Sequence, residues 1–146
     1  MKKYSISILI SFLAVVFAGG TLFSAYGQQA KQAEPVKNNP EFSIARFVVA
    51  ADIKDKEPAI ITDKFTVKTE KVYCFLETKN IAKDNEISFV WIYNQKEMLK
   101  TTLTLKTGSR WRTYADKTLR GLKGDWKVEL RDASGKTLKE VNFKVE

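Results

Sequence analysis

The chain has 146 residues, which is enough for one domain with a short extension. Its 25 Lys and Arg residues outnumber 17 Asp and Glu residues, giving a formal charge of +8, and it contains no histidine and one cysteine. This composition excludes serine–histidine and cysteine–histidine nucleophiles, histidine metal sites, an internal disulfide and a thiolate zinc cluster. The 44% hydrophobic content indicates a folded domain rather than a disordered chain.

Residues 1–27 have the pattern of a secretory signal peptide. Lys2 and Lys3 precede an uncharged, apolar stretch over residues 6–23, and Ala25 and Gly27 have the small side chains that signal peptidase requires. We expect cleavage after Gly27 and export to the periplasm or the extracellular space. The alternative is an uncleaved segment, residues 6–23, that anchors the chain in the inner membrane.

Residues 28–41 are polar and contain few large apolar side chains. Such a segment buries too little apolar surface to fold, so we expect a flexible linker. The folded domain is therefore predicted to span residues 42–146.

Within this domain the apolar residues recur with a period of two, which is typical of β-strands. The run Ile87–Tyr93 predicts a strand buried on both faces, whereas Trp126–Arg131 and Leu99–Leu105 predict strands with one solvent-exposed face. Leu138 is out of phase with Val141 and the later apolar residues, which predicts a β-bulge near Lys139 and Glu140. The other predicted strands are Phe42–Ala51, Phe65–Thr69, Val72–Thr78, a strand through Arg110–Tyr114, and Thr137–Val145.

Turn residues separate these runs. Asp132–Gly135 predicts a hairpin loop, Asn94–Lys96 predicts a connection between two strands, and Asp116–Arg120 predicts one helical turn that is capped by Asp116 and ended by Gly121. Seven or eight short strands without a long amphipathic helix predict an all-β, antiparallel, immunoglobulin-like β-sandwich. A small, partly open barrel is the alternative.

The segment Arg110-Trp111-Arg112-Thr113-Tyr114 is the candidate ligand-binding site. On a strand, Arg110, Arg112 and Tyr114 share one face, where two guanidinium groups beside a phenol can bind a carboxylate, phosphate or sulfated sugar. Alternatively, Trp111 belongs to the core and the arginines form surface ion pairs with acids such as Glu77 or Glu129. Both interpretations stay open at this point.

Other residues offer little chemistry. Cys74 lies in an apolar run and is expected to be buried and inert, and Trp91 and Trp126 are expected in the core. The acids of the Asp52–Glu57 segment alternate with lysines, which favours solvated loop charges over a catalytic or metal site. We therefore expect no catalytic residue, no metal and no cofactor. Dispersed lysines and export also argue against nucleic-acid binding.

Several motifs together resemble a known family. Arg110–Tyr114 is followed by Gly124-Asp125-Trp126-Lys127-Val128 and by Asp132–Leu138. Before these motifs stand Glu57-Pro58, Val72–Phe75 and Phe89–Tyr93, and after them stands Phe143–Val145. This order resembles the bacterial domain of unknown function 2914 over nearly all of residues 42–146. The family pattern has a histidine where this chain has Phe89. The resemblance implies a small β domain, often attached to membrane or envelope proteins, without an established activity.

Three hypotheses for function follow. The first is a non-catalytic, exported binding module of the cell envelope, whose ligand is an envelope protein or an anionic polysaccharide. The second is a structural, accessory domain that is tethered to the membrane and pairs through an exposed strand edge with a membrane protein. The third is an enzyme of unknown class.

Overall fold

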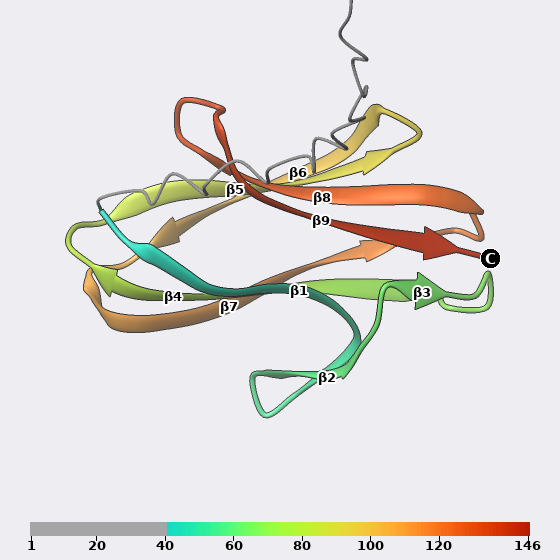
Figure 1. Cartoon of the computed structure of the whole chain (residues 1–146), viewed down its shortest axis with the longest axis horizontal. Coiled ribbons are helices and arrows are strands. Elements are labelled where there is room, and N and C mark those ends of the chain that lie inside the picture. The colour runs from blue at the N-terminus through green and yellow to red at the C-terminus, as the bar shows by residue number, and fades with distance from the viewer. Residues whose placement is uncertain (1–40) are drawn as a thin grey trace, which may run out of the picture. The chain divides into compact units, whose positions relative to one another are not determined.

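The computed structural model describes residues 41–146, which form nine β-strands in two packed sheets (Figure 1). The expected signal segment, residues 1–27, and residues 28–40 of the expected linker lie outside the described residues. The strands are β1 (Ser43–Lys54), β2 (Glu57–Ile61), β3 (Lys64–Phe65), β4 (Lys71–Ile81), β5 (Asn85–Tyr93), β6 (Lys96–Leu105), β7 (Gly108–Thr118), β8 (Gly124–Asp132) and β9 (Thr137–Val145). Among residues 41–146, no helix is long and apolar enough to cross a membrane.

One sheet has four strands in the order β2-β1-β4-β7, and the other has five in the order β3-β9-β8-β5-β6. All pairings are antiparallel except that of β3 with β9. The antiparallel β-sandwich predicted from the sequence is confirmed, with nine strands in place of seven or eight. The additional strand is β2, which begins at Glu57, the last residue of the segment whose charges favoured a loop.

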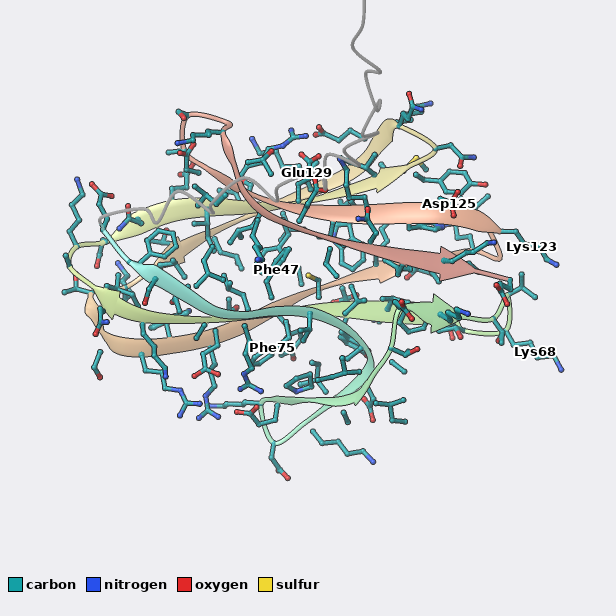
Figure 2. The ribbon with its side chains drawn as sticks, in the orientation of Figure 1. Phe47, Lys68, Phe75, Lys123, Asp125 and Glu129 are labelled. Carbon is teal, nitrogen blue, oxygen red and sulfur yellow. The ribbon has the colours of Figure 1, made fainter. Side chains whose placement is uncertain are left out.

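The core lies between the two sheets and is filled by the alternating apolar residues of their inner faces. Phe47 of β1 and Phe89 of β5 meet there, with ring centroids 6.0 Å apart, and Figure 2 shows Phe47 in the space between the sheets. Trp91 and Trp126 are buried, as expected. β5 is buried on both faces from Ile87 to Trp91, which confirms the prediction from its continuous apolar run.

The four-stranded sheet buries side chains on its second face as well. We call this face, which is turned away from the five-stranded sheet, the outer face. Phe75 of β4 and Ala50 of β1 are fully buried but stand outside the main core cluster. The hairpin of β1 and β2 lies on this side of the sheet, and Figure 2 shows Phe75 between the sheet and β2. A small second core therefore fixes the hairpin on the outer face.

Three local predictions need correction. The strand predicted over Phe65–Thr69 is wrong beyond Phe65, because β3 ends there and the chain turns at Val67 and Lys68. The helical turn predicted over Asp116–Arg120 is absent, because β7 continues its pairing with β4 as far as Thr118. The chain then reverses in a tight turn at Arg120 and Gly121, both with positive φ, which the glycine adopts without strain. The bulge in β9 is confirmed, but the extra residue is Leu138, one position before the predicted site.

Candidate functional site

The predicted site residues lie on β7, which is an edge strand of the four-stranded sheet. Ten register pairs align β7 with β4 without a shift, from Lys71–Thr118 to Ile81–Gly108. The main-chain groups on the other side of β7 face no strand among residues 41–146. We call this side, from Gly108 to Thr118, the free edge of β7.

Arg110 and Arg112 both point to the outer face, but they pair with different glutamates. Arg110 donates from Nε to Oε1 of Glu77 on β4 at 2.6 Å. Arg112 donates to Glu57, the first residue of β2. The alternative that these arginines form ion pairs is therefore confirmed for Glu77. The suggested pairing with Glu129 is wrong, because that residue lies on β8 of the other sheet.

Arg46 of β1 joins the two pairs into one network. Its Nη2 lies 2.6 Å from carboxylate oxygens of both Glu57 and Glu77, and its guanidinium carbon is 4.7 Å from the centroid of the Phe75 ring. Arginine stacks well on aromatic rings because its planar cation is weakly hydrated. Three of the five arginines of the chain thus surround two glutamates.

The network sets the ionisation of its acids. The hydrogen bond from Arg110 is the largest cause that lowers the pKa of Glu77, with Arg46 adding to it. The pKa of Glu57 is lowered first by Arg46 and then by Arg112. The pKa of Arg46 is raised in turn by its hydrogen bond to Glu57. Both glutamates are therefore anionic at neutral pH.

The structure brings all four predicted site residues together. Arg110, Trp111, Arg112 and Tyr114 line a shallow hollow of about 500 Å³ together with Thr113 and Lys56. Trp111 is 36% exposed, and Tyr114 is 44% exposed with its ring edge-on to Tyr73 at 5.9 Å. Trp111 therefore does not belong to the core, and the hollow is reached from both faces of the strand.

Part of the positive charge in this hollow is not paired with an acidic group among the residues that the structure describes. Arg110 uses only Nε in its pair, so its two terminal nitrogens make no hydrogen bond within residues 41–146. Lys56, at the tip of the β1–β2 hairpin, makes no ion pair within the same residues and is exposed. Chemically, the site can bind anionic groups, stack on aromatic rings and hydrogen-bond an extended strand.

Sequence reasoning missed Arg46, Lys56 and Glu57 as parts of this site. Glu57 and Asp52 were expected as solvated loop charges, but Asp52 lies on β1 and Glu57 begins β2. One feature of the sequence could have indicated this network. The chain has few arginines and many lysines, and arginine is favoured over lysine where a carboxylate is bound through two hydrogen bonds.

A buried glutamate occupies the outer side of the other sheet as well. Glu129 of β8 is 7% exposed, and it accepts hydrogen bonds from Arg131 and Thr137 and pairs with Lys127. Figure 2 shows Glu129 above the five-stranded sheet. The expectation that β8 has one solvent-exposed face is therefore wrong at this position, because flanking side chains cover the carboxylate.

The remaining candidate residues are structural. Cys74 is fully buried as expected, and burial raises the pKa of its thiol well above the ordinary value. Residues 41–146 contain no group of three or more Cys, Asp or Glu side chains placed to hold a metal ion.

Comparison with solved structures identifies the type of fold. An immunoglobulin-like protein from Pseudomonas aeruginosa is similar over 73% of this chain and 97% of its own, with 14% identity and a TM-score of 0.51. β-Glucosidases from Kluyveromyces marxianus and Listeria innocua are similar at 16% and 10% identity and TM-scores of 0.42 and 0.47, and only 14% and 16% of those enzymes is covered. The first similarity confirms the immunoglobulin-like fold.

Comparison with protein families gives one match, and no curated protein matches. The family model described as "Protein of unknown function (DUF2914)" matches residues 84–145, from the start of β5 to the end of β9. The matched part contains the predicted site on β7 but not Glu57, Glu77 or Arg46. The predicted resemblance to this family is therefore confirmed over residues 84–145, whereas the motifs expected at Glu57-Pro58 and Val72–Phe75 lie outside the match.

Proposed function

We propose that this protein is a non-catalytic, exported binding module of the bacterial cell envelope, and that its binding surface is the free edge of β7. The observation that carries the proposal is the hollow along this strand, which exposes Trp111 and Tyr114 on an edge whose outward main-chain groups pair with no strand among residues 41–146. An enzyme is disfavoured because the chain has no histidine and the acids at this site are held in ion pairs.

A protein partner fits this surface best. An extended segment added to β7 gains main-chain hydrogen bonds along the strand, while the exposed side chains select its sequence. Acidic residues in the partner fit beside Arg110 and Lys56, where positive charge is in excess. A membrane protein is one such partner. In that case residues 6–23 stay uncleaved and anchor the domain in the membrane beside its partner.

An anionic polysaccharide is the second candidate. The terminal nitrogens of Arg110 are geometrically suited to a carboxylate or sulfate, which arginine binds through two parallel hydrogen bonds. This candidate ranks second because Arg110 and Arg112 are already held by Glu77 and Glu57, so fewer donors remain than a strongly bound anion requires.

The test is site-specific photo-crosslinking in cells that make the protein at its native level. The probe is placed at Ser109 on β7 and, as a matched control, at Thr104 on β6, another exposed position on an edge strand. We expect a discrete protein adduct from Ser109 alone. Equal adducts from both positions, or none from Ser109, would contradict a protein-binding role for this edge.

The polysaccharide is tested on the purified protein with dextran sulfate as the probe. If this candidate is correct, Arg110→Ala weakens binding more than Lys100→Ala, which removes the same charge from exposed β6. Equal effects of the two variants indicate non-specific attraction by the net positive charge and exclude the arginine site.

A further inference from the structure

The four edge strands of the sandwich differ in how they are protected against pairing. β3 has two residues, and β6 carries a bulge at Met98, where its register with β5 shifts. β2 has five residues, including Pro58, and it is kinked at Ile60, whose φ is +55°. Short length, bulges and proline are the devices by which edge strands avoid pairing with other chains.

β7 has none of these devices. It is eleven residues long, its register with β4 is regular throughout, and it contains no proline. Its only lysine, Lys117, lies one residue from the C-terminal end and donates to the carbonyl oxygen of Thr118. A long, regular edge of this kind is a template for another strand.

We propose that β7 pairs antiparallel with β7 of a second copy of this chain, with Thr113 on the two-fold axis. The pairing joins the two four-stranded sheets into one continuous sheet across the dimer. This inference rests on the proposed function, because it uses the same free edge and names the second copy as the protein partner.

Symmetry leaves few registers to choose from. A two-fold axis perpendicular to the sheet keeps the outer faces of both copies on one side, so each residue lies opposite a residue of the same face. Residues of the same face are separated by an even number of positions, so the axis must pass through a residue and not between two residues. With Thr113 on the axis, all eleven residues of the strand are paired, because Thr113 is the midpoint of Gly108–Thr118.

The side chains are complementary in this register. Arg110 lies opposite Asp116 of the second copy, so that opposite charges meet twice in the dimer. Arg112 lies opposite Tyr114, where a guanidinium group can stack on the phenol ring. On the other face, the large Trp111 lies opposite the small Ala115.

The neighbouring registers are worse. An axis at Arg112 places the two Arg112 side chains directly opposite each other, and like charges in that position are destabilising. An axis at Tyr114 leaves Gly108 and Ser109 unpaired and places Trp111 opposite Lys117. The charge pattern therefore selects Thr113.

Asp116 is available for the second copy. Its only ion pair within residues 41–146 is with Lys71 at 3.2 Å, and both side chains of this pair are 42% exposed. Such pairs contribute little to stability, so Asp116 can accept Arg110 of the second copy at small cost. The dimer is accordingly expected to be reversible and sensitive to salt.

The direct test is disulfide trapping. The protein is purified from cells that express it, with its N-terminus as those cells process it. Residues opposite each other in an antiparallel pair have Cα atoms about 4.5–5.5 Å apart, a separation that a disulfide spans. We expect Thr113→Cys to give a covalent dimer under mild oxidation. Ser109→Cys alone should not, but it should crosslink when mixed with Lys117→Cys, its expected opposite residue. Thr104→Cys on β6 is the control, and Cys74 adds no background because it is buried.

Sedimentation of the unmodified protein gives a second readout that does not depend on a cysteine variant. We expect a concentration-dependent dimer, and we expect Asp116→Arg to weaken association about tenfold or more, because each dimer contains the 110–116 pair twice. Sedimentation as a monomer at all concentrations, or trapping of Thr113→Cys no faster than Thr104→Cys, would overturn the inference.

The two proposals fail in different ways. If the protein is monomeric while Ser109 still crosslinks to a different protein in cells, the binding function stands and the second copy is excluded. If Ser109 yields no adduct and Thr113→Cys is not trapped, both proposals fail.

Discussion

Glu57 and Arg112 join the two edge strands of one sheet by an ion pair across its outer face. Glu57 begins β2 and Arg112 lies on β7, at opposite ends of the strand order β2-β1-β4-β7. Contact between two edges is possible because the β1–β2 hairpin lies over the outer face, where Phe75 and Ala50 are buried (Figure 2). The hairpin thus places Glu57 and Lys56 beside the strand that we propose as the binding edge.

Glu77 should matter more to stability than Glu57. The Glu77 side chain is 5% exposed and accepts from Arg46 and Arg110, whereas the Glu57 side chain is 37% exposed. Glu77→Gln places amide hydrogens against guanidinium groups, and we expect it to lower the free energy of unfolding by roughly 1–3 kcal/mol. Glu57→Gln should have a clearly smaller effect, because water screens its pairs. Urea unfolding of the two variants makes the comparison, and equal losses would contradict it.

Arg112→Ala should loosen the β1–β2 hairpin without unfolding the sandwich. The variant removes the contact between Glu57 and β7 but leaves Arg46 to hold Glu57. We expect faster amide exchange in residues 52–59 and unchanged exchange in β8, measured by mass spectrometry. Lys100→Ala is the control for the lost charge. If exchange in the hairpin is unchanged, the ion pair does not hold the hairpin in place.

Asp84 should make stability depend on acid pH. Its carboxylate accepts hydrogen bonds from Lys106 and from the main chain and side chain of Thr107, and these lower its pKa from 3.8 to about 2. A lowered pKa in the folded state stabilises the fold fully above the ordinary value, and the stabilisation is lost as the pH falls through about 2. Asp84→Asn should lower the melting temperature by a few degrees at pH 7 and hardly at all near pH 2. Asp55→Asn, at an exposed turn, is the control, and a constant difference across this range would refute the assignment.

Cys74 should be unreactive in the folded protein. Its side chain is fully buried, and burial raises the pKa of the thiol, so little thiolate is present. We expect no reaction with a disulfide reagent until denaturant unfolds the chain, whereas an added Thr104→Cys should react at once. A fast reaction of the native thiol would mean that β4 opens locally.

Much of the fold was predictable because it rests on local periodicity. The continuous apolar run of β5 predicts a strand buried on both faces, and the alternation around Trp126 predicts a strand with one buried face. Both strands are present, although Glu129 is buried on the face of β8 that was expected to be exposed. The turn at Asn94 and Gln95 is also confirmed, with positive φ at both residues, the backbone conformation of the tightest hairpins.

The parts that failed depend on contacts between distant segments. Nothing local shows that the polar segment around Asp55 forms a hairpin that folds back onto the sheet, so Glu57 was expected in solvent. Arg46 and Glu77 are 31 residues apart, and Arg112 and Glu57 are 55 apart. Their pairing follows from the path of the hairpin over the outer face. For β7, periodicity gave the faces of Arg110 and Arg112 correctly, but it could not reveal that the strand lies at an edge.

The central claim, that β7 has a free edge available for binding, is tested most directly by residue-resolved amide exchange of the protein in dilute solution. In an antiparallel edge strand, alternate amides point to the neighbouring strand and the others point outward. We predict slow exchange for the β7 amides that bond to β4 and fast exchange for the alternate amides from Gly108 to Thr118. Uniformly slow exchange along β7 in the dilute monomer would mean that this edge is already covered, and it would contradict the proposed binding surface.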